Sequence, residues 1–349
     1  MNKPMPYWYR LRGLSLIEMM LALVISSVLI IGIIQIYIGS KQSYRLQEGQ
    51  SRIQENARYV MELLERDLRI AGYMGCVSRI TPNVIANPPV NVNLTSSISG
   101  HEGTGSSWSP TLPTNLSSMS SPNHVIKGTD VIRIDFGESC GGNLKGNMAA
   151  DNANIQIVFP NTCDLVESSC SGGTCTGEVI LISDCQAADL FRGSSVSNGT
   201  ITQTIAHANN VNSTNRLSKA YQEDAEVFKL RSYTYFIRAG ESGIPALWRL
   251  NNLVATGGTN PLELVEGIED LQVVYGEDTD SNGSPNRYLS ANQVNFANVV
   301  SVRVTLRARS PSDNLTLASR TYSFDNANVT DRRLARTFTT TIGVRNRLP

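Results

Sequence analysis

An apolar run near the start of the chain, residues 14–38, limits what this protein can fold into more than any other feature. The run has 25 residues, no proline and one charged side chain, that of Glu18. A helix of this length reaches roughly 37 Å, which is enough to cross a bilayer with some tilt. We therefore predict a transmembrane helix over residues 14–38.

The residues before this run set its orientation. Lys3, Arg10 and Arg12 precede it, so the positive-inside rule keeps the start of the chain in the cytoplasm and exports the rest. A secretory signal has a shorter apolar core followed by a cleavage site of small residues, and this run is too long for that class. The sequence predicts a single-pass inner-membrane anchor with a periplasmic domain.

Glu18 is unusual within such an anchor. A carboxylate in hydrocarbon costs a few kcal/mol on insertion scales, so it normally has a partner or a function. Alternatively, its side chain reaches up to the headgroups beside the basic flank. The position of Glu18 alone leaves both interpretations open.

The residues around Glu18 carry a resemblance to a known signal. A short basic leader is followed by "GLSLIE" at residues 13–18 and then by the apolar run, and this order resembles the class III signal of type IV prepilins. The resemblance implies a leader over residues 1–13, cleavage after Gly13 by a prepilin peptidase, and N-methylation of Leu14 as the new N-terminus. It also implies that Glu18 docks subunits by pairing with the free α-amine of a neighbour, because each charge needs the other in lipid.

Two positions depart from the common pattern of that family. Leu14 stands where the family most often has Phe, and this is an acceptable substitution. Gln35 stands where many major pilins carry a Pro, so the resemblance gives no reason to expect a kink there.

A second helical pattern follows the apolar run, over residues 39–72. Apolar residues recur there at steps of three and four, which is the spacing of one helix face, and Gly72 provides a stop signal. We predict that this helix packs on a sheet through Ile53, Val60 and Leu64, with a coiled-coil stalk as the alternative. The full stripe consists of Ile53, Ala57, Val60, Leu64, Leu68 and Ala71.

The remainder, residues 76–349, is predicted to be a β-rich periplasmic domain. Residues 80–128 are rich in Ser, Asn, Pro and Thr, which is typical of a surface loop or insertion. Beyond them, short runs rich in β-branched residues alternate apolar and polar side chains, as half-buried antiparallel strands do. These runs lie at residues 130–136, 154–159, 178–182, 226–238, 245–250, 270–276, 298–309 and 335–347. The predicted class is α+β, with a long N-terminal helix on an antiparallel sheet, which is the type IV pilin architecture.

Several downstream segments resemble PilW-type minor pilins. They include "AGYMGC" at the end of the helical pattern, "VEGIEDLQVVYGEDTD", "NVVSVRVTLRARS" and "RTFTTTIGVRNR". The resemblance implies a structural role without catalysis: a minor pilin that primes type IV pilus assembly and can remain at the tip, supporting twitching motility and adhesion. The implied partners are other minor pilins and the major pilin, contacted through the N-terminal helix, and the inner-membrane assembly machinery.

Other function classes remain as alternatives. A type II secretion pseudopilin would have the same signal and helix. A membrane-anchored periplasmic enzyme would need a catalytic constellation, but the sequence has three scattered histidines and no catalytic motif. The chain could also be an adhesin itself, with residues 80–128 at its exposed end. Nucleic-acid binding is not expected, because 30 basic residues are balanced by 30 acidic ones.

Six cysteines follow the apolar run: Cys76, Cys140, Cys163, Cys170, Cys175 and Cys185. Their spacing is neither that of a CxxC redox pair nor that of a zinc site, and the histidines are not near them. An even number of cysteines in an exported chain predicts disulfides, for which fifteen pairings are possible.

One acidic stretch has the chemistry of a metal ligand set. Asp278, Asp280 and Asn282 stand at alternate positions before Gly283, as in the first half of an EF-hand loop. The twelfth position is Leu289 instead of the usual glutamate. The sequence therefore leaves two interpretations open, a weak calcium site or a polar hairpin turn; no other cofactor is predicted.

Overall fold

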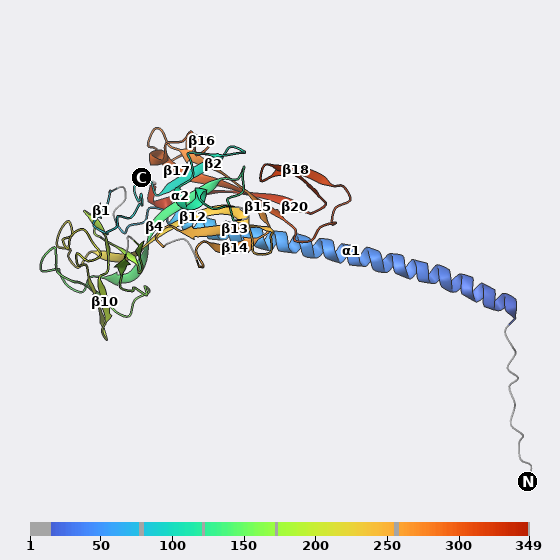
Figure 1. The fold of residues 1–349 in the computed structure, drawn as a ribbon, viewed down its shortest axis with the longest axis horizontal. Helices are drawn as coiled ribbons and strands as arrows, with labels where there is room; N and C mark the ends of the chain where they lie inside the picture. Colours follow the sequence, from blue (N-terminus) through green and yellow to red (C-terminus); the bar gives the residue numbers. More distant parts are fainter. Residues whose placement is uncertain (1–14, 77–79, 121–122, 172–173, 255–257, 348–349) are drawn as a thin grey trace, which may run out of the picture. The chain divides into compact units, whose positions relative to one another are not determined.

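The structure is a computed structural model that describes residues 15–76, 80–120, 123–171, 174–254 and 258–347. The chain divides into two compact units, residues 1–51 and 52–349. The described part of the first unit is helical, and the second is a globular unit made mostly of strands (Figure 1). The α+β class predicted from the sequence is confirmed.

The N-terminal helix, α1, extends from Leu16 to Arg69. Its large apolar side chains between Leu16 and Ile38 are exposed. By length and composition, α1 is the one helix in the described part of the chain that could cross a membrane. The helix therefore presents to its surroundings the apolar surface that the sequence predicted for a membrane span.

Two antiparallel sheets form the body of the globular unit. Within the described residues, the larger sheet has nine strands, and the pair β1–β9 is its one parallel ladder. Its strands are β1 (Asn83–Val84), β9 (Ala188–Arg192), β8 (Val179–Ser183), β12 (Glu226–Ala239), β4 (Val131–Asn143), β2 (Ile98–Gly103) and β3 (Trp108–Ser109), with β13 (Pro245–Asn251) and β14 (Leu262–Glu266) extending from β12. The second sheet has the order β16 (Arg287–Leu289), β15 (Ile268–Glu277), β17 (Val299–Arg309) and β20 (Ala335–Gly343).

Smaller elements complete the unit. A three-stranded sheet contains β10 (Ser195–Asn198), β11 (Thr202–Ala206) and β5 (Ile155–Val158). Two hairpins are formed by β18 (Arg320–Phe324) with β19 (Ala327–Asp331) and by β6 (Cys170–Ser171) with β7 (Thr174–Cys175). The short helical turns are α2 (Thr114–Ser117), η1 (Phe296–Asn298) and η2 (Arg345–Arg347).

Each apolar run selected as a strand contains one, and the differences lie at the ends. The last strand, β20, ends at Gly343, because the chain then enters the turn η2. The Ser-rich segment 80–128 holds strands as well as loops. Ile98 and Gly100 face Ile134 and Ile132 across the β2–β4 ladder, which joins this segment to the main sheet.

The main core lies between α1 and the two sheets. The stripe that starts at Ile53 is buried against Ile134 of β4, Tyr235 of β12 and Val304 of β17. Along β4 and β17, every second side chain belongs to this core, as Ile132, Ile134 and Phe136 do in β4. Burial of alternate apolar residues is what orients both sheets toward the helix.

The helix ends where the chain must turn sharply. Gly72 has a positive φ of 73° and donates its N–H to the Asp135 carbonyl of β4 at 2.9 Å. A side chain at Gly72 would also meet the Ser97 Cβ at 2.9 Å. Glycine is therefore required here both for its conformation and for the close approach.

An additional lobe separates β4 from β12 along the chain. We call residues 144–225 the side lobe; it carries the three-stranded sheet, contributes β8 and β9 to the main sheet, and lies near the label β10 in Figure 1. Its own apolar core includes Ile155, Phe191 and Tyr221. Sequence reasoning predicted two strands in this range but not a separate core.

Candidate functional sites

The proposed processing site lies at the edge of what the structure describes. Gly13 and Leu14 are outside the described residues, while Ser15 and Glu18 lie at the start of α1. The Ser15 N–H donates to Glu18 Oε2 at 2.9 Å, and the Ser15 hydroxyl donates to the same oxygen at 3.1 Å. In return, the Glu18 N–H donates to Ser15 Oγ at 3.2 Å. This reciprocal pattern is a capping box, which satisfies N–H groups that a helix start leaves unpaired.

Glu18 combines this capping role with an apolar setting. Its side chain is exposed, and its neighbours Ile17, Met19 and Met20 are exposed apolar residues. In a membrane or a helical bundle these neighbours would be buried, and the carboxylate would be surrounded by hydrocarbon. The Ser15 contacts then supply two hydrogen bonds but no opposite charge. A cation in these surroundings would be attracted to the Glu18 carboxylate.

The residues predicted to dock the helix lie in one row within the globular unit. Ile53 is 1% exposed, and Val60 and Leu64 are fully buried. They share a core cluster with residues of β4, β12, β15 and β17. Burial of each such side chain contributes roughly 1.5–3 kcal/mol, so the row is a substantial part of what holds α1 to the sheets.

A polar contact sits inside the same interface. Asp67 of α1 is fully buried, accepts a hydrogen bond from the Tyr235 hydroxyl, and pairs with Arg66 Nε at 2.9 Å. Burial of a carboxylate without partners is costly. The contact between Asp67 and Tyr235 therefore favours the register of helix and sheet in which the two side chains meet. The periodicity pointed to an apolar helix face but not to Asp67, because a charged residue next to Arg66 looks like part of the solvent-facing surface.

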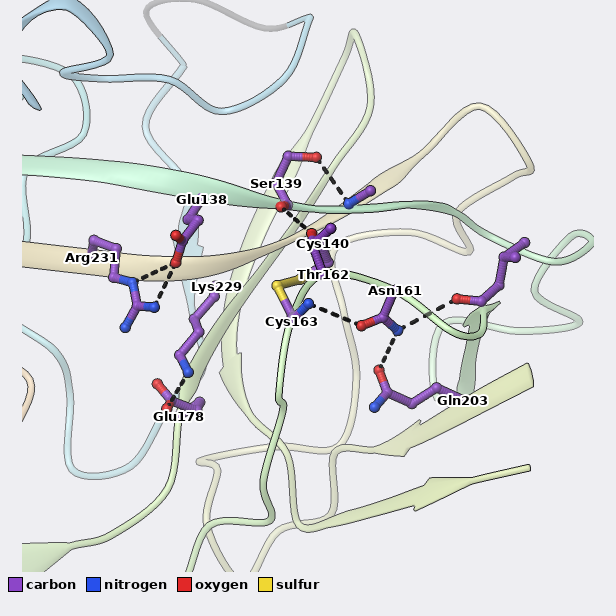
Figure 2. Close-up of a disulfide and its surroundings, with 12 residues drawn as sticks. Glu138, Ser139, Cys140, Asn161, Thr162, Cys163, Glu178, Gln203, Lys229 and Arg231 are labelled. Carbon is purple, nitrogen blue, oxygen red and sulfur yellow. Dashed lines mark hydrogen bonds and ion pairs between the residues drawn. A yellow bond between two sulfur atoms is a disulfide. The ribbon is translucent and has the colours of Figure 1, made fainter. Parts of the chain in front are cut away.

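The six cysteines form three disulfides: Cys76–Cys185, Cys140–Cys163 and Cys170–Cys175. The first joins the end of the helical region to the turn after β8. The second joins β4 to the side lobe, as Figure 2 shows, and the Asn161 side chain accepts the Cys163 N–H at 3.1 Å beside it. The third closes the β6–β7 hairpin.

Ion pairs brace the strands next to the Cys140–Cys163 disulfide. Figure 2 shows Arg231 of β12 paired with Glu138 of β4, and Lys229 of β12 paired with Glu178, with shortest N–O distances of 2.5 Å. The Glu138 pair ties the far end of β4 to β12, the Glu178 pair ties β12 to the start of β8, and the disulfide ties β4 to Cys163 of the side lobe. This end of the sheet is therefore held by covalent and ionic contacts as well as by its ladder.

The acidic loop uses its carboxylates to hold its own turn. Asp278 Oδ1 accepts the N–H of Asp280 at 3.2 Å, and Oδ2 accepts the N–H of Gly283 at 2.8 Å. Asn282 Nδ2 donates to Asp280 Oδ2 at 3.0 Å. Within the described ranges, no group of three or more His, Cys, Asp or Glu side chains is placed to hold a metal ion. The contacts fit the polar-turn interpretation, while calcium binding stays a prediction.

Two further features escaped the sequence reasoning. Asp130, which precedes β4, accepts the N–H of Gly103 from β2 and the N–H of Val273 from β15, both at 2.8 Å, and so joins the two sheets. A cavity of about 890 Å³ lies beside Arg238 and Trp248. Neither had a local signal, because each is assembled from segments that are distant in the sequence.

Comparison with known proteins gives two family matches. Residues 234–346 match the family described as Type IV Pilus-assembly protein W, and residues 9–34 match the prokaryotic N-terminal methylation motif. The comparisons found no match among curated proteins or among solved structures. The resemblance predicted from the sequence, to a prepilin signal at one end and to PilW-type proteins at the other, is confirmed over these two ranges, and it indicates a membrane-anchored component of type IV pilus assembly.

Proposed function

We propose that this chain is a minor pilin that helps to initiate type IV pilus assembly in a priming or tip complex with other minor pilins. The observation that carries the proposal is the combination of the two family matches with a helix that exposes its apolar first half and docks its amphipathic second half on antiparallel sheets. Such a chain has a structural role in which its helix is the assembly element and no reaction is catalysed.

Processing follows from the start of α1. A prepilin peptidase cuts after Gly13, and the amine of Leu14 is then methylated. Ser15 and Glu18 already form the helix cap, so the new N-terminus lies directly before a preformed first turn. Before assembly, the Glu18 carboxylate lies in the inner membrane, where Ser15 provides hydrogen bonds but no opposite charge.

Assembly then supplies that charge. The methylated amine of a neighbouring pilin remains a cation, and Glu18 is the one carboxylate in the apolar run. In surroundings of low dielectric constant, the attraction between the two offsets the free-energy cost of burying each charge alone. The partners are other minor pilins and the major pilin, and the chain moves from the inner membrane to the base or tip of the pilus.

A type II secretion pseudopilin would share the signal and the helix. The match of residues 234–346 to a pilus-assembly family favours the pilus. Deletion of the gene in the native host should lower surface piliation and twitching, and the wild-type gene should restore both. The processed chain should appear in sheared pili; loss of protein secretion with normal piliation would contradict the proposal.

A further inference from the structure

The face of the main sheet that points away from α1 carries a cavity of about 890 Å³. Met119, Ser120 and Asn123 contribute to one wall, and the floor contains Arg238 of β12, Trp248 of β13 and Glu263 of β14. Tyr235 and Leu247 belong to the opposite face, which packs on α1. The volume lies within the range of small-ligand pockets in proteins.

Two donors at this cavity lack acceptors. Trp248 is 5% exposed, and neither its Nε1 nor the Nε of Arg238 has a hydrogen-bond partner among the described residues. The Arg238 guanidinium stacks on the Trp248 ring with its carbon 3.6 Å from the ring centroid. Burying a donor without an acceptor costs about 1–3 kcal/mol. Oxygen atoms of a bound molecule would remove that cost.

Acceptors stand beside these donors. Glu263 lies opposite Trp248 in the β13–β14 ladder, and one of its carboxylate oxygens accepts the Glu241 N–H at 2.9 Å. Glu266 lines the same cavity, and Leu262 of β14 adds apolar surface. The cavity therefore offers donors, acceptors and apolar contacts within a small area.

This combination selects one class of ligand. An anion would be opposed by the three glutamates, and an amine would leave the indole and guanidinium donors unpaired. A purely apolar ligand would leave both kinds of polar group unsatisfied. A sugar ring carries hydroxyls that donate and accept together, and its C–H face packs on apolar side chains.

We propose that this cavity binds a neutral saccharide unit. Arg238 covers the indole, so the sugar reaches Trp248 when the guanidinium moves off the ring toward Glu263. The ring hydroxyls then accept from Trp248 Nε1 and Arg238 and donate to the glutamate carboxylates. This site goes beyond the assembly role, and its test does not depend on pili.

The probe molecules are two neutral disaccharides, cellobiose and N,N′-diacetylchitobiose. The full chain is placed in lipid nanodiscs, because common detergents carry sugar headgroups. Saturation-transfer NMR and a tryptophan-fluorescence titration should both show saturable binding of at least one disaccharide. Glucuronate and trilysine serve as anionic and cationic comparisons and should bind at least tenfold more weakly.

Two substitutions with matched controls localise the binding. Trp248→Phe keeps the packing but removes the indole N–H, and Glu263→Gln removes the charge; each should weaken binding about tenfold. Trp108→Phe, in the neighbouring cavity, and Glu223→Gln, in an exposed position on the side lobe, should change binding less than twofold.

Several results would overturn the proposal. One is the absence of saturable binding by either disaccharide, and another is an equal loss with Trp248→Phe and Trp108→Phe in variants with wild-type melting temperatures. Binding of trilysine but not of the disaccharides would identify the cavity as a site for basic peptides instead. Binding of glucuronate alone would show that Arg238 outweighs the glutamates, which also contradicts a neutral ligand.

Discussion

The Tyr235 hydroxyl on β12 donates a hydrogen bond to the Asp67 carboxylate on α1, and both side chains are fully buried. Burial, together with Asp67 beside it, raises the pKa of Tyr235, so the hydroxyl keeps its proton and remains a donor. This bond lies inside the row of apolar contacts that attaches α1 to the sheets. Together with the Asn56 side chain, which donates to the Glu266 carbonyl of β14 at 2.9 Å, this bond favours one register between the helix and the strands.

Tyr235→Phe should therefore lower the free energy of unfolding by about 1–3 kcal/mol, because the buried Asp67 carboxylate loses a hydrogen-bond donor that water cannot replace. Urea unfolding of the solubilised chain measures the change. The control is Tyr233→Phe, since Tyr233 is half-buried and its ring stacks on Arg249. Equal unfolding midpoints for the two variants would show that the Asp67 bond has no specific effect.

The charge of Glu18 can be separated from its capping role. Glutamine also completes a capping box, so Glu18→Gln should keep the helix start while removing the anion that pairs with a neighbour's amine. We expect Glu18→Gln and Glu18→Ala to be cleaved normally and to be recovered poorly in sheared pili. Immunoblots of membranes and sheared pili provide the measurement. Wild-type recovery of Glu18→Gln, with a defect in Glu18→Ala alone, would assign Glu18 to capping.

Gly13→Arg should block maturation, because a bulky cation before the scissile bond does not fit where the signal has a residue without a side chain. The expected product is an uncut, unmethylated precursor that stays in the membrane, detected by intact mass. Arg12→Lys keeps the leader charge and should be cut normally. A normal processed mass for Gly13→Arg would remove the central premise of the proposed maturation.

Periodic patterns are what made parts of this fold predictable. The stripe through Ile53 and Leu64 and the alternation in β17 are repeated over many residues. One residue that departs from the pattern therefore does not change the predicted secondary structure. The α+β class and the position of each long strand followed from them. The side lobe did not, because its core joins Ile155 to Tyr221 across segments without any shared period.

The candidate sites show the same division. The prepilin signal is a contiguous motif, so it could be read from residues 13–18. The acidic loop had the right side chains for a cation, but the direction of the Asp278 oxygens depends on backbone N–H groups that the sequence does not place. The cavity at Trp248 needs both the loop around Met119 and the strand β14, which come together only in the folded chain.

Asp130 should make the stability of the globular unit depend on pH. Burial raises the pKa of this carboxyl to about 7, against the lowering effect of the N–H bonds from Gly103 and Val273, and Glu102 and Asp270 add to the rise. The folded chain thus holds a proton that the unfolded chain releases near pH 4. The resulting stabilisation is complete below pH 4 and is lost as the pH rises through 7.

Between pH 5 and pH 8 we expect the free energy of unfolding to fall by about 2–3 kcal/mol from this group. Asp130→Asn should be less stable at both pH values, because its amide opposes a backbone N–H, and should lack most of this dependence. Asp313 is half-buried, and the N–H groups of Asn314 and Arg332 lower the pKa of its carboxyl, so Asp313→Asn removes a group that titrates below pH 5 and should keep the wild-type slope. Parallel slopes for wild type and Asp130→Asn in urea unfolding would exclude Asp130 as the cause.

The three disulfides should differ in how much they stabilise the chain. Cys76–Cys185 closes a loop with a sequence separation of 109, whereas Cys170–Cys175 closes one of 5. In the chain-entropy account the longer loop restricts the unfolded chain more, by about 5 kcal/mol against about 2 kcal/mol. We therefore expect the double variant Cys76→Ser, Cys185→Ser to unfold at a clearly lower urea concentration than Cys170→Ser, Cys175→Ser. Equal midpoints, with the remaining disulfides verified by mass, would mean that Cys76–Cys185 stabilises the chain no more than the short β6–β7 disulfide does, which contradicts the chain-entropy account.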